Sequence, residues 1–380
     1  MEGIRDMALG SMVAAEDNYN SACDSKKIYL EYLRIIACVL VIYNHLSGYM
    51  LFVITHGVCQ FLYMILTMIT KINVPIFFMI TGTLLLGKEE DIKTVISKRI
   101  SRFLLVILIF VGGLYVITYI QSVIAGEPLE KPLYNFIMGV LNNNVCGIYW
   151  YLYAYLGFLF MLPFMQRIVK NITRDDVCIL LLLNFVFSSF IPLINIMLNK
   201  LSLDPISICN DFSIPLATSS AFFYPLIGYY IDNKIDVSKF KNKHIIYLLL
   251  SGGIGIIISC WCTYYEGRKI GEYTQRYVYL FTYVIAIAVF LIVKYLVTVA
   301  FPKLSKGKIS KTITLIGSLT FGIYLFDPYL KTIFYTTYQV YIENHLPTII
   351  ASMNWVLIST FVGGGITFIL KKATILKKII

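Results

Sequence analysis

Ten long apolar runs, separated by short polar segments, dominate the sequence. Each is long enough to cross the roughly 30 Å hydrocarbon core of a membrane as a helix. The runs are 28–50, 58–87, 100–124, 147–169, 177–198, 212–232, 244–265, 277–299, 311–331 and 348–370. Because only 14% of residues are charged and 58% are hydrophobic, a soluble domain of this length would lack charge to cover its surface. The pattern predicts an all-α, polytopic helical bundle in the cell membrane, with about ten transmembrane helices.

The second apolar run is unusually long and is interrupted by polar residues and a proline. Lys71, Asn73 and Pro75 lie near its middle. Proline removes a backbone donor, and irregular backbone is tolerated in a membrane where protein surrounds it. The sequence therefore predicts a broken element, with an outer piece near 58–70 and a membrane helix from about 73 to 87.

Lysine and arginine concentrate in alternate loops. Of the 32 such residues, 24 lie in segments 1–27, 88–102, 166–176, 232–244, 294–311 and 371–380. The positive-inside rule predicts that these segments are cytoplasmic, and an even number of helices places both termini inside. The net charge of +11 thus reflects topology. Positive charge spread over six short segments, with no single basic face, argues against a nucleic-acid partner.

One transmembrane domain, residues 28–372, is predicted to account for nearly the whole chain. Residues 1–27 include several acidic side chains and lack the apolar core of a signal peptide, which predicts a disordered cytoplasmic leader. Residues 373–380 are predicted to form a short basic cytoplasmic tail. Cys260 and Cys262 form an isolated Cys-x-Cys that does not indicate a metal site or a disulfide. No metal is predicted.

Two ionisable residues, Arg34 and His45, lie eleven positions apart in the first apolar run. Eleven helical residues return to nearly the same face, about 16 Å further along the axis. Because ionisable groups inside a membrane are costly, they indicate a functional site by default. The pair predicts a site that holds an anionic ligand and performs proton chemistry at His45. The structural alternative is a snorkelling arginine with a buried histidine bonded to a carbonyl.

A second basic pair, Arg99 and Arg102, lies at the cytoplasmic start of the third run. Residues three apart on a helix are neighbours, so both guanidinium groups can reach one ligand. Paired arginines suit phosphate groups, and a helix N-terminus also favours anions. The alternative is that these residues fix topology or contact anionic lipid.

Three segments taken in order resemble the acyltransferase 3 family, whose integral-membrane enzymes modify bacterial surface polysaccharides and related acceptors. The family pattern has Arg or Lys, ten residues and then His, followed by Phe-Phe-x-Ile-Ser-Gly and by Arg-x-x-Arg. The matching segments here are Arg34…His45, Phe77-Phe78-Met-Ile-Thr81-Gly82 and Arg99-x-x-Arg102. Segments 149–152 and 318–325 also look like family positions, so the resemblance covers about 28–372. Thr81 replaces the usual serine, which is a mild departure.

The resemblance implies an acyl-CoA donor in the cytoplasm, with acetyl-CoA as the default. It also implies an acceptor hydroxyl on an envelope glycan or lipid-linked molecule. In this interpretation Arg99 and Arg102 hold the CoA phosphates, Arg34 orients the donor and His45 is the general base. Trp150 is predicted to form a wall of the substrate site. The alternative for Trp150 is an interfacial aromatic belt.

Asp327 marks the second departure from the family, because many members carry histidine at this position. In the predicted topology Asp327 and His45 lie at similar depths in helices that both run outward. We therefore expect Asp327 to face the same cavity and to orient His45 or stabilise its protonated form. The alternative is that Asp327 caps an interfacial turn before Pro328.

Binding or transport of a small solute is an alternative function. The same membrane fold occurs in the membrane part of vancomycin-resistance serine racemases, where it is associated with serine supply. A partner in polysaccharide export is a related alternative. Neither function requires acyl-CoA, so CoA-dependent acyl transfer distinguishes them from the enzyme.

Overall fold

The computed structural model describes residues 27–45, 57–127, 129–209, 211–271, 273, 275–341, 343–345 and 347–372. Within these ranges every regular element is helical, and nine helical segments are long and apolar enough to cross a membrane. The prediction of a polytopic helical membrane bundle is confirmed. Residues 1–26 of the predicted leader and the whole predicted tail, 373–380, lie outside the described residues.

The nine candidate spans are built from single helices or from helices joined end to end. The main helices are α2 (Ile28–His45), α4 (Val58–Thr70), α5 (Asn73–Leu85), α6 (Ile92–Thr94), α7 (Ser101–Ile124), α9 (Trp150–Lys170), α10 (Arg174–Phe185), α11 (Ile191–Lys200), α14 (Asn242–Ile270), α15 (Thr282–Tyr295), α16 (Gly307–Tyr341) and α17 (Thr348–Leu370). The second span is interrupted as predicted, since α4 and α5 are separated by Lys71 and Ile72.

The predicted run 212–232 forms two short helices, α12 (Pro215–Thr218) and α13 (Ser220–Lys234). A 15-residue helix such as α13 is about 22 Å long, which is short for a lipid-exposed span. Most of α13 is buried, including Phe223, Leu226 and Ile227, because it packs inside the bundle against α5. A further short helix, α8 (Pro132–Leu141), was not predicted.

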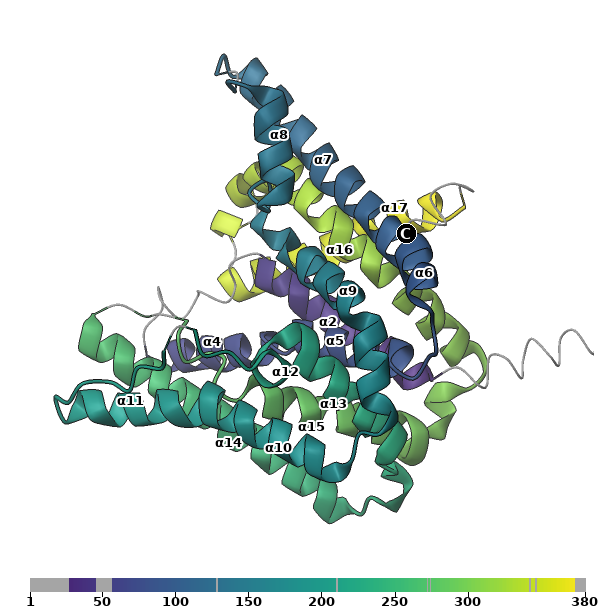
Figure 1. Ribbon diagram of the computed structural model, residues 1–380. Helices are drawn as coiled ribbons and strands as arrows, with labels where there is room; N and C mark the ends of the chain where they lie inside the picture. The colour runs from purple at the N-terminus through teal and green to yellow at the C-terminus, as the bar shows by residue number, and fades with distance from the viewer. Residues whose placement is uncertain are drawn as a thin grey trace, which may run out of the picture.

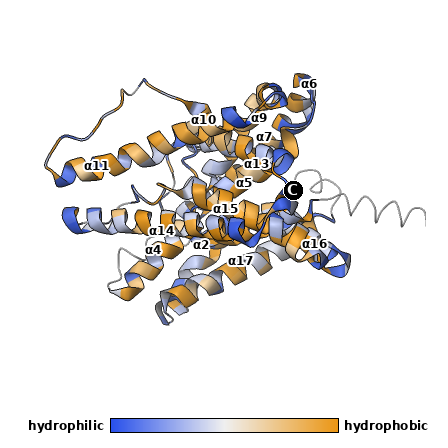
Figure 2. Cartoon of the chain, turned by 90° about the horizontal axis from the view of Figure 1, so that it is seen from below, coloured by the Kyte–Doolittle hydropathy of each residue, from blue (hydrophilic) through white to orange (hydrophobic). Residues whose placement is uncertain are grey.

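The centre of the bundle is formed by α2 and α5, with α13, α15 and α16 packed around them. Figure 1 shows α2 and α5 in the middle, with α7, α8 and α16 above them and α10, α14 and α15 below. Figure 2 shows that the long helices are hydrophobic over most of their length and hydrophilic mainly near their ends. Exposed apolar side chains on the outer helices, such as Leu108, Ile257 and Phe361, suit contact with lipid. The chain is a multi-pass integral membrane protein.

A buried cation holds the ends of three helices together. Lys294 on α15 donates hydrogen bonds of 3.0–3.3 Å to the carbonyl oxygens of Ile231, Asp232 and Ile235 at the end of α13. The Asp232 carboxylate also accepts hydrogen bonds from Lys27 and from the Tyr29 hydroxyl of α2. Cations stabilise helix C-termini, so this cluster is a structural anchor.

Two glycines allow α5 and α13 to pack backbone against backbone. A Cβ atom at Gly228 would lie 2.2 Å from the carbonyl oxygen of Met79, and one at Gly82 would lie 2.0 Å from that of Pro225. Small residues permit this close approach between membrane helices. The Gly82 end of the Phe-Phe motif is therefore a packing contact that fixes α5 in the bundle.

We expect Gly228→Ala to destabilise the protein, because backbone cannot move aside as a flexible side chain can. Overpacking of this kind costs about 1–3 kcal/mol or more, which should lower the melting temperature in detergent by several degrees. Gly253→Ala on α14 is the matched control, since its Cβ would meet nothing within 4 Å. Equal melting temperatures for the two variants would contradict the close-packing argument.

Candidate active site

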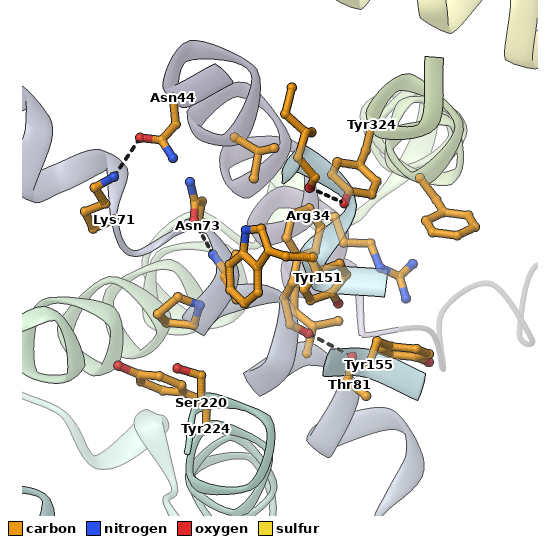
Figure 3. A pocket seen from close by; sticks show the side chains of 18 of the residues that line it. Arg34, Asn44, Lys71, Asn73, Thr81, Tyr151, Tyr155, Ser220, Tyr224 and Tyr324 are labelled. Atoms are coloured by element: carbon orange, nitrogen blue, oxygen red, sulfur yellow. Dashed lines mark hydrogen bonds between the residues drawn. The ribbon is translucent and has the colours of Figure 1, made fainter. Parts of the chain in front are cut away.

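A cavity of about 1720 Å³ lies between the central helices. Its lining includes five of the six predicted site residues: Arg34, His45, Arg99, Arg102 and Trp150. The sixth, Asp327, is fully buried and does not line the cavity, so the expectation that it faces the cavity is wrong. We call the part around Arg34, Arg99 and Arg102 the inner end, and the part around Asn44, His45 and Lys71 the outer end, following the predicted direction of α2. Figure 3 shows Arg34 and Tyr155 on one side of this pocket and Asn44 and Lys71 on the other, with Tyr151 between them.

At the inner end, Arg34 is held by a carboxylate from the same helix. Its Nη1 donates to Glu31 Oε1 at 2.9 Å and to Oε2 at 3.0 Å. Glu31 is only 3% exposed and packs on Gly317 of α16, where a Cβ would lie 2.3 Å from Glu31 Oε2. A charge-assisted pair of this kind fixes the guanidinium of Arg34 at the cavity wall. The arginine is therefore part of a packed site inside the bundle.

The second basic pair occupies the same end of the cavity. Arg99 binds Glu90 through two hydrogen bonds, from Nε at 2.6 Å and from Nη2 at 2.5 Å. This pairing lowers the pKa of the Glu90 carboxyl below its usual range, so Glu90 stays ionised at neutral pH. Arg34, Arg102 and Tyr155 line the cavity together with Arg99. Three guanidinium groups thus belong to the cavity wall.

A row of aromatic rings connects the two ends of the cavity. The ring centroids of Tyr155 and Tyr151 are 6.0 Å apart, and those of Tyr151 and Tyr324 are also 6.0 Å apart. The Tyr324 ring is in turn 6.0 Å from that of His45. Tyr151 and Tyr155 come from α9 and Tyr324 from α16. The row gives the cavity an apolar wall between the arginines and the histidine.

At the outer end, His45 is paired with a fully buried carboxylate. Its Nδ1 lies 2.7 Å from Asp327 Oδ2, and Asp327 is 0% exposed. The other carboxylate oxygen accepts a 2.6 Å hydrogen bond from Ser359 Oγ on α17. An ionised carboxylate can only accept a hydrogen bond, so with an ionised Asp327 the neutral ring of His45 carries its proton on Nδ1 and has Nε2 as its basic nitrogen.

The helix that carries Asp327 continues through Pro328 to Tyr341, so no interfacial turn follows Asp327. On the same helix, Lys331 donates a 2.6 Å hydrogen bond from Nζ to the backbone oxygen of His45. This contact satisfies a carbonyl at the C-terminal end of α2. Two residues of α16 therefore fix both the ring and the backbone of His45.

Trp150 begins α9 and is 49% exposed at the cavity margin. The neighbouring residues fix this end of α9 against α16. The Tyr149 hydroxyl donates to Leu325 O at 2.7 Å, and the Tyr324 hydroxyl donates to Ile148 O at 3.0 Å. The two later segments that resembled the family, 149–152 and 318–325, thus lie against each other.

Several residues of this site were not singled out from the sequence. Glu31 stands three positions before Arg34, the spacing of neighbours on a helix face, and this was a usable signal. Ser359 gave no signal, because a serine in an apolar helix usually bonds its own backbone. In the sequence, Lys71 and Asn73 indicate only a helix break. In the described part of the chain, no group of three or more His, Cys, Asp or Glu side chains forms a candidate metal site.

Comparison with known families gives one match. A family model described as an acyltransferase domain, Acyl_transf_3, matches residues 27–371, nearly the whole chain. No curated protein and no solved structure matches significantly. The match covers every residue described above at the cavity.

Proposed function

The chain belongs to the acyltransferase 3 family and is a membrane-bound acyltransferase; from this premise we propose that it transfers an acyl group, by default acetyl, from acyl-CoA to a hydroxyl of a cell-envelope acceptor. The observation that carries the proposal is one cavity with three arginines at one end and a carboxylate-paired histidine at the other. This arrangement supports a polyanionic donor and base catalysis in the same space.

The inner end suits the phosphates of CoA. Arg99 and Arg102 supply guanidinium groups of the type that binds phosphate, and Arg34 adds a third. The aromatic row then leads from Tyr155 to His45, and an elongated pantetheine arm would follow this apolar wall. Arg34 and His45 are about 16 Å apart along α2, so the arm would bring the thioester to the histidine. The cavity volume of about 1720 Å³ exceeds that of a usual single-ligand pocket and leaves room for an acceptor.

His45 is proposed as the general base. Nε2 takes the proton of the acceptor hydroxyl, and the hydroxyl oxygen attacks the carbonyl carbon of the thioester. The carbon–sulfur bond then breaks, and the CoA thiolate receives the proton from His45. Asp327 holds Nδ1 and stabilises the positive charge that the ring carries between these steps. Ser359 keeps the Asp327 carboxylate in place. Trp150 would form part of the substrate wall at the cavity mouth.

Binding of CoA tests the donor half of the proposal. We expect purified wild-type protein in nanodiscs to bind CoA and consume acetyl-CoA. The double variant Arg99→Ala/Arg102→Ala should weaken CoA binding by about 100-fold or more, because each charge-assisted hydrogen bond contributes about 1.5–3 kcal/mol. Isothermal titration calorimetry with CoA measures the change.

Arg268→Ala/Lys269→Ala is the matched control, since these two basic residues are exposed at the end of α14 and do not line the cavity. It should bind CoA as the wild type does. If folded wild-type protein has no affinity for CoA, the proposal of acyl transfer from CoA is wrong. Binding and uptake of serine and other small solutes would then be measured.

A further inference from the structure

The outer end of the cavity contains a cluster of hydrogen-bond donors that the proposed reaction does not use. Lys71, in the break between α4 and α5, is 6% exposed and lines the cavity. Its Nζ donates to Asn44 Oδ1 at 3.1 Å and lies 5.5 Å from the centroid of the Tyr279 ring. Figure 3 shows this hydrogen bond, with Asn73 beside it. Asn44 directly precedes His45, so the cluster adjoins the base.

Hydrogen bonding fixes the orientation of both asparagine amides. Lys71 can only donate, so the oxygen of Asn44 must face it. The oxygen of Asn73 accepts the backbone N–H of Val74. The nitrogen of each amide therefore points away from the partner of its oxygen. Among the described residues, neither nitrogen has a hydrogen-bond acceptor. Both asparagines line the cavity. The wall at this point offers an ammonium group and two amide donors.

The surroundings reinforce the positive potential. α5 begins at Asn73, and a helix N-terminus carries partial positive charge. Lys331, whose Nζ donates to the His45 carbonyl oxygen, also lines the cavity, as does Arg276, which pairs with Glu266 at 3.6 Å. Of the lining residues in the described ranges, Glu90 alone has a carboxylate, and it is bound to Arg99 at the inner end. A neutral sugar needs acceptors as well as donors, whereas an anion needs only donors.

We infer that Lys71, Asn44 and Asn73 form a subsite for an anionic group of the acceptor, a carboxylate or a phosphate, next to the hydroxyl that is acylated. This inference rests on the proposed function, since it assigns the cluster to the acceptor. The subsite holds the acceptor by its charged group and thereby brings the neighbouring hydroxyl to His45. Three arginines hold the donor at the opposite end, so the two anions occupy separate positively charged regions.

Equilibrium binding of defined sugars to CoA-loaded protein in nanodiscs tests the subsite. The probes are methyl β-D-glucuronide, glucose 6-phosphate and the neutral methyl β-D-glucoside. We expect the wild type to bind at least one anionic probe about tenfold or more tightly than the neutral one, as a charge-assisted hydrogen bond implies. The better of the two anionic probes identifies carboxylate or phosphate as the preferred group.

Two variants locate the preference. Lys71→Met removes the charge and keeps an unbranched side chain. Asn73→Asp keeps the acceptor for the Val74 N–H but adds a negative charge, so it should preserve the fold. Each variant should reduce the ratio of affinities for the anionic and the neutral probe to about one or below, and its affinity for CoA should be unchanged. Lys200→Met, at an exposed lysine outside the cavity lining, should keep the wild-type ratio.

The failures of the two proposals are distinguishable. The subsite would be overturned by any of three results: equal affinity for charged and neutral probes, no binding of any probe, or a retained preference in both variants. None of these results affects CoA binding or turnover. A loss of CoA affinity in Lys71→Met would also overturn it, because the cluster would then belong to the donor site. Wild-type protein that prefers the anionic probes without binding CoA would instead overturn the acyl-CoA reaction.

Discussion

We expect His45→Ala to abolish acyl transfer. Turnover of acetyl-CoA should fall by at least about 10²–10⁴-fold, the usual contribution of a general base. The physical reason is that Nε2 is the basic nitrogen that the buried Asp327 leaves available at the cavity. CoA affinity should remain near the wild-type value, because the guanidinium groups lie at the other end of the cavity. Release of free CoA thiol and mass spectrometry of the acceptor measure the loss.

The control for this prediction is His244→Ala. His244 lies at the start of α14, where its Nδ1 accepts the backbone N–H of Lys241, and it does not line the cavity. This variant should retain full turnover. Transfer at the wild-type rate in a correctly inserted His45→Ala protein would remove His45 from the role of base and leave its pairing with Asp327 as a structural contact.

Asp327→Asn is expected to lower kcat by about 10²-fold or more while KM for acetyl-CoA changes little. An asparagine can present its NH₂ group to Nδ1 and so favour the tautomer that carries its proton on Nε2. A protonated Nε2 cannot act as the base. It also loses the negative charge that stabilises a protonated ring. Initial rates over a range of acetyl-CoA concentrations separate kcat from KM.

Ser359→Ala provides the graded comparison for Asp327→Asn. It removes the hydrogen bond to Asp327 Oδ1 but keeps the carboxylate, so the loss of kcat should be smaller than for the asparagine variant. Melting temperatures of both proteins in detergent show whether a loss of activity follows a loss of fold. An unchanged kcat in a stable Asp327→Asn protein would refute the positioning role.

Hydropathy and charge in the sequence were sufficient to predict the bundle. The helix break at Lys71 also followed from local residues, because a polar pair and Pro75 interrupt an apolar run. The family was recognisable from three short motifs in order, since each is contained within one or two helical turns or one helix face. These features depend on residues near one another in the chain, where periodicity and spacing are informative.

The length and burial of α13 were decided by tertiary packing. The run 212–232 contains no lysine, arginine or glutamate, and its single aspartate stands at the end, so the sequence predicted a full span. The structure buries the 15-residue helix against α5 through Gly82 and Gly228, and protein surrounds it in place of lipid. Composition does not distinguish an apolar helix inside a bundle from one that faces lipid, because both avoid water.

The sequence by itself determined which residues carry charge inside the membrane, and only the tertiary structure decided which of them meet. His45 and Asp327 are 282 positions apart, and depth in a predicted topology suggested their pairing without specifying the neighbouring helices. The Ser359–Asp327 and Lys71–Asn44 contacts became visible once α2, α5, α16 and α17 were packed together. The physical reason is that buried polar groups must be satisfied within the protein, and helix packing determines which partner is in reach.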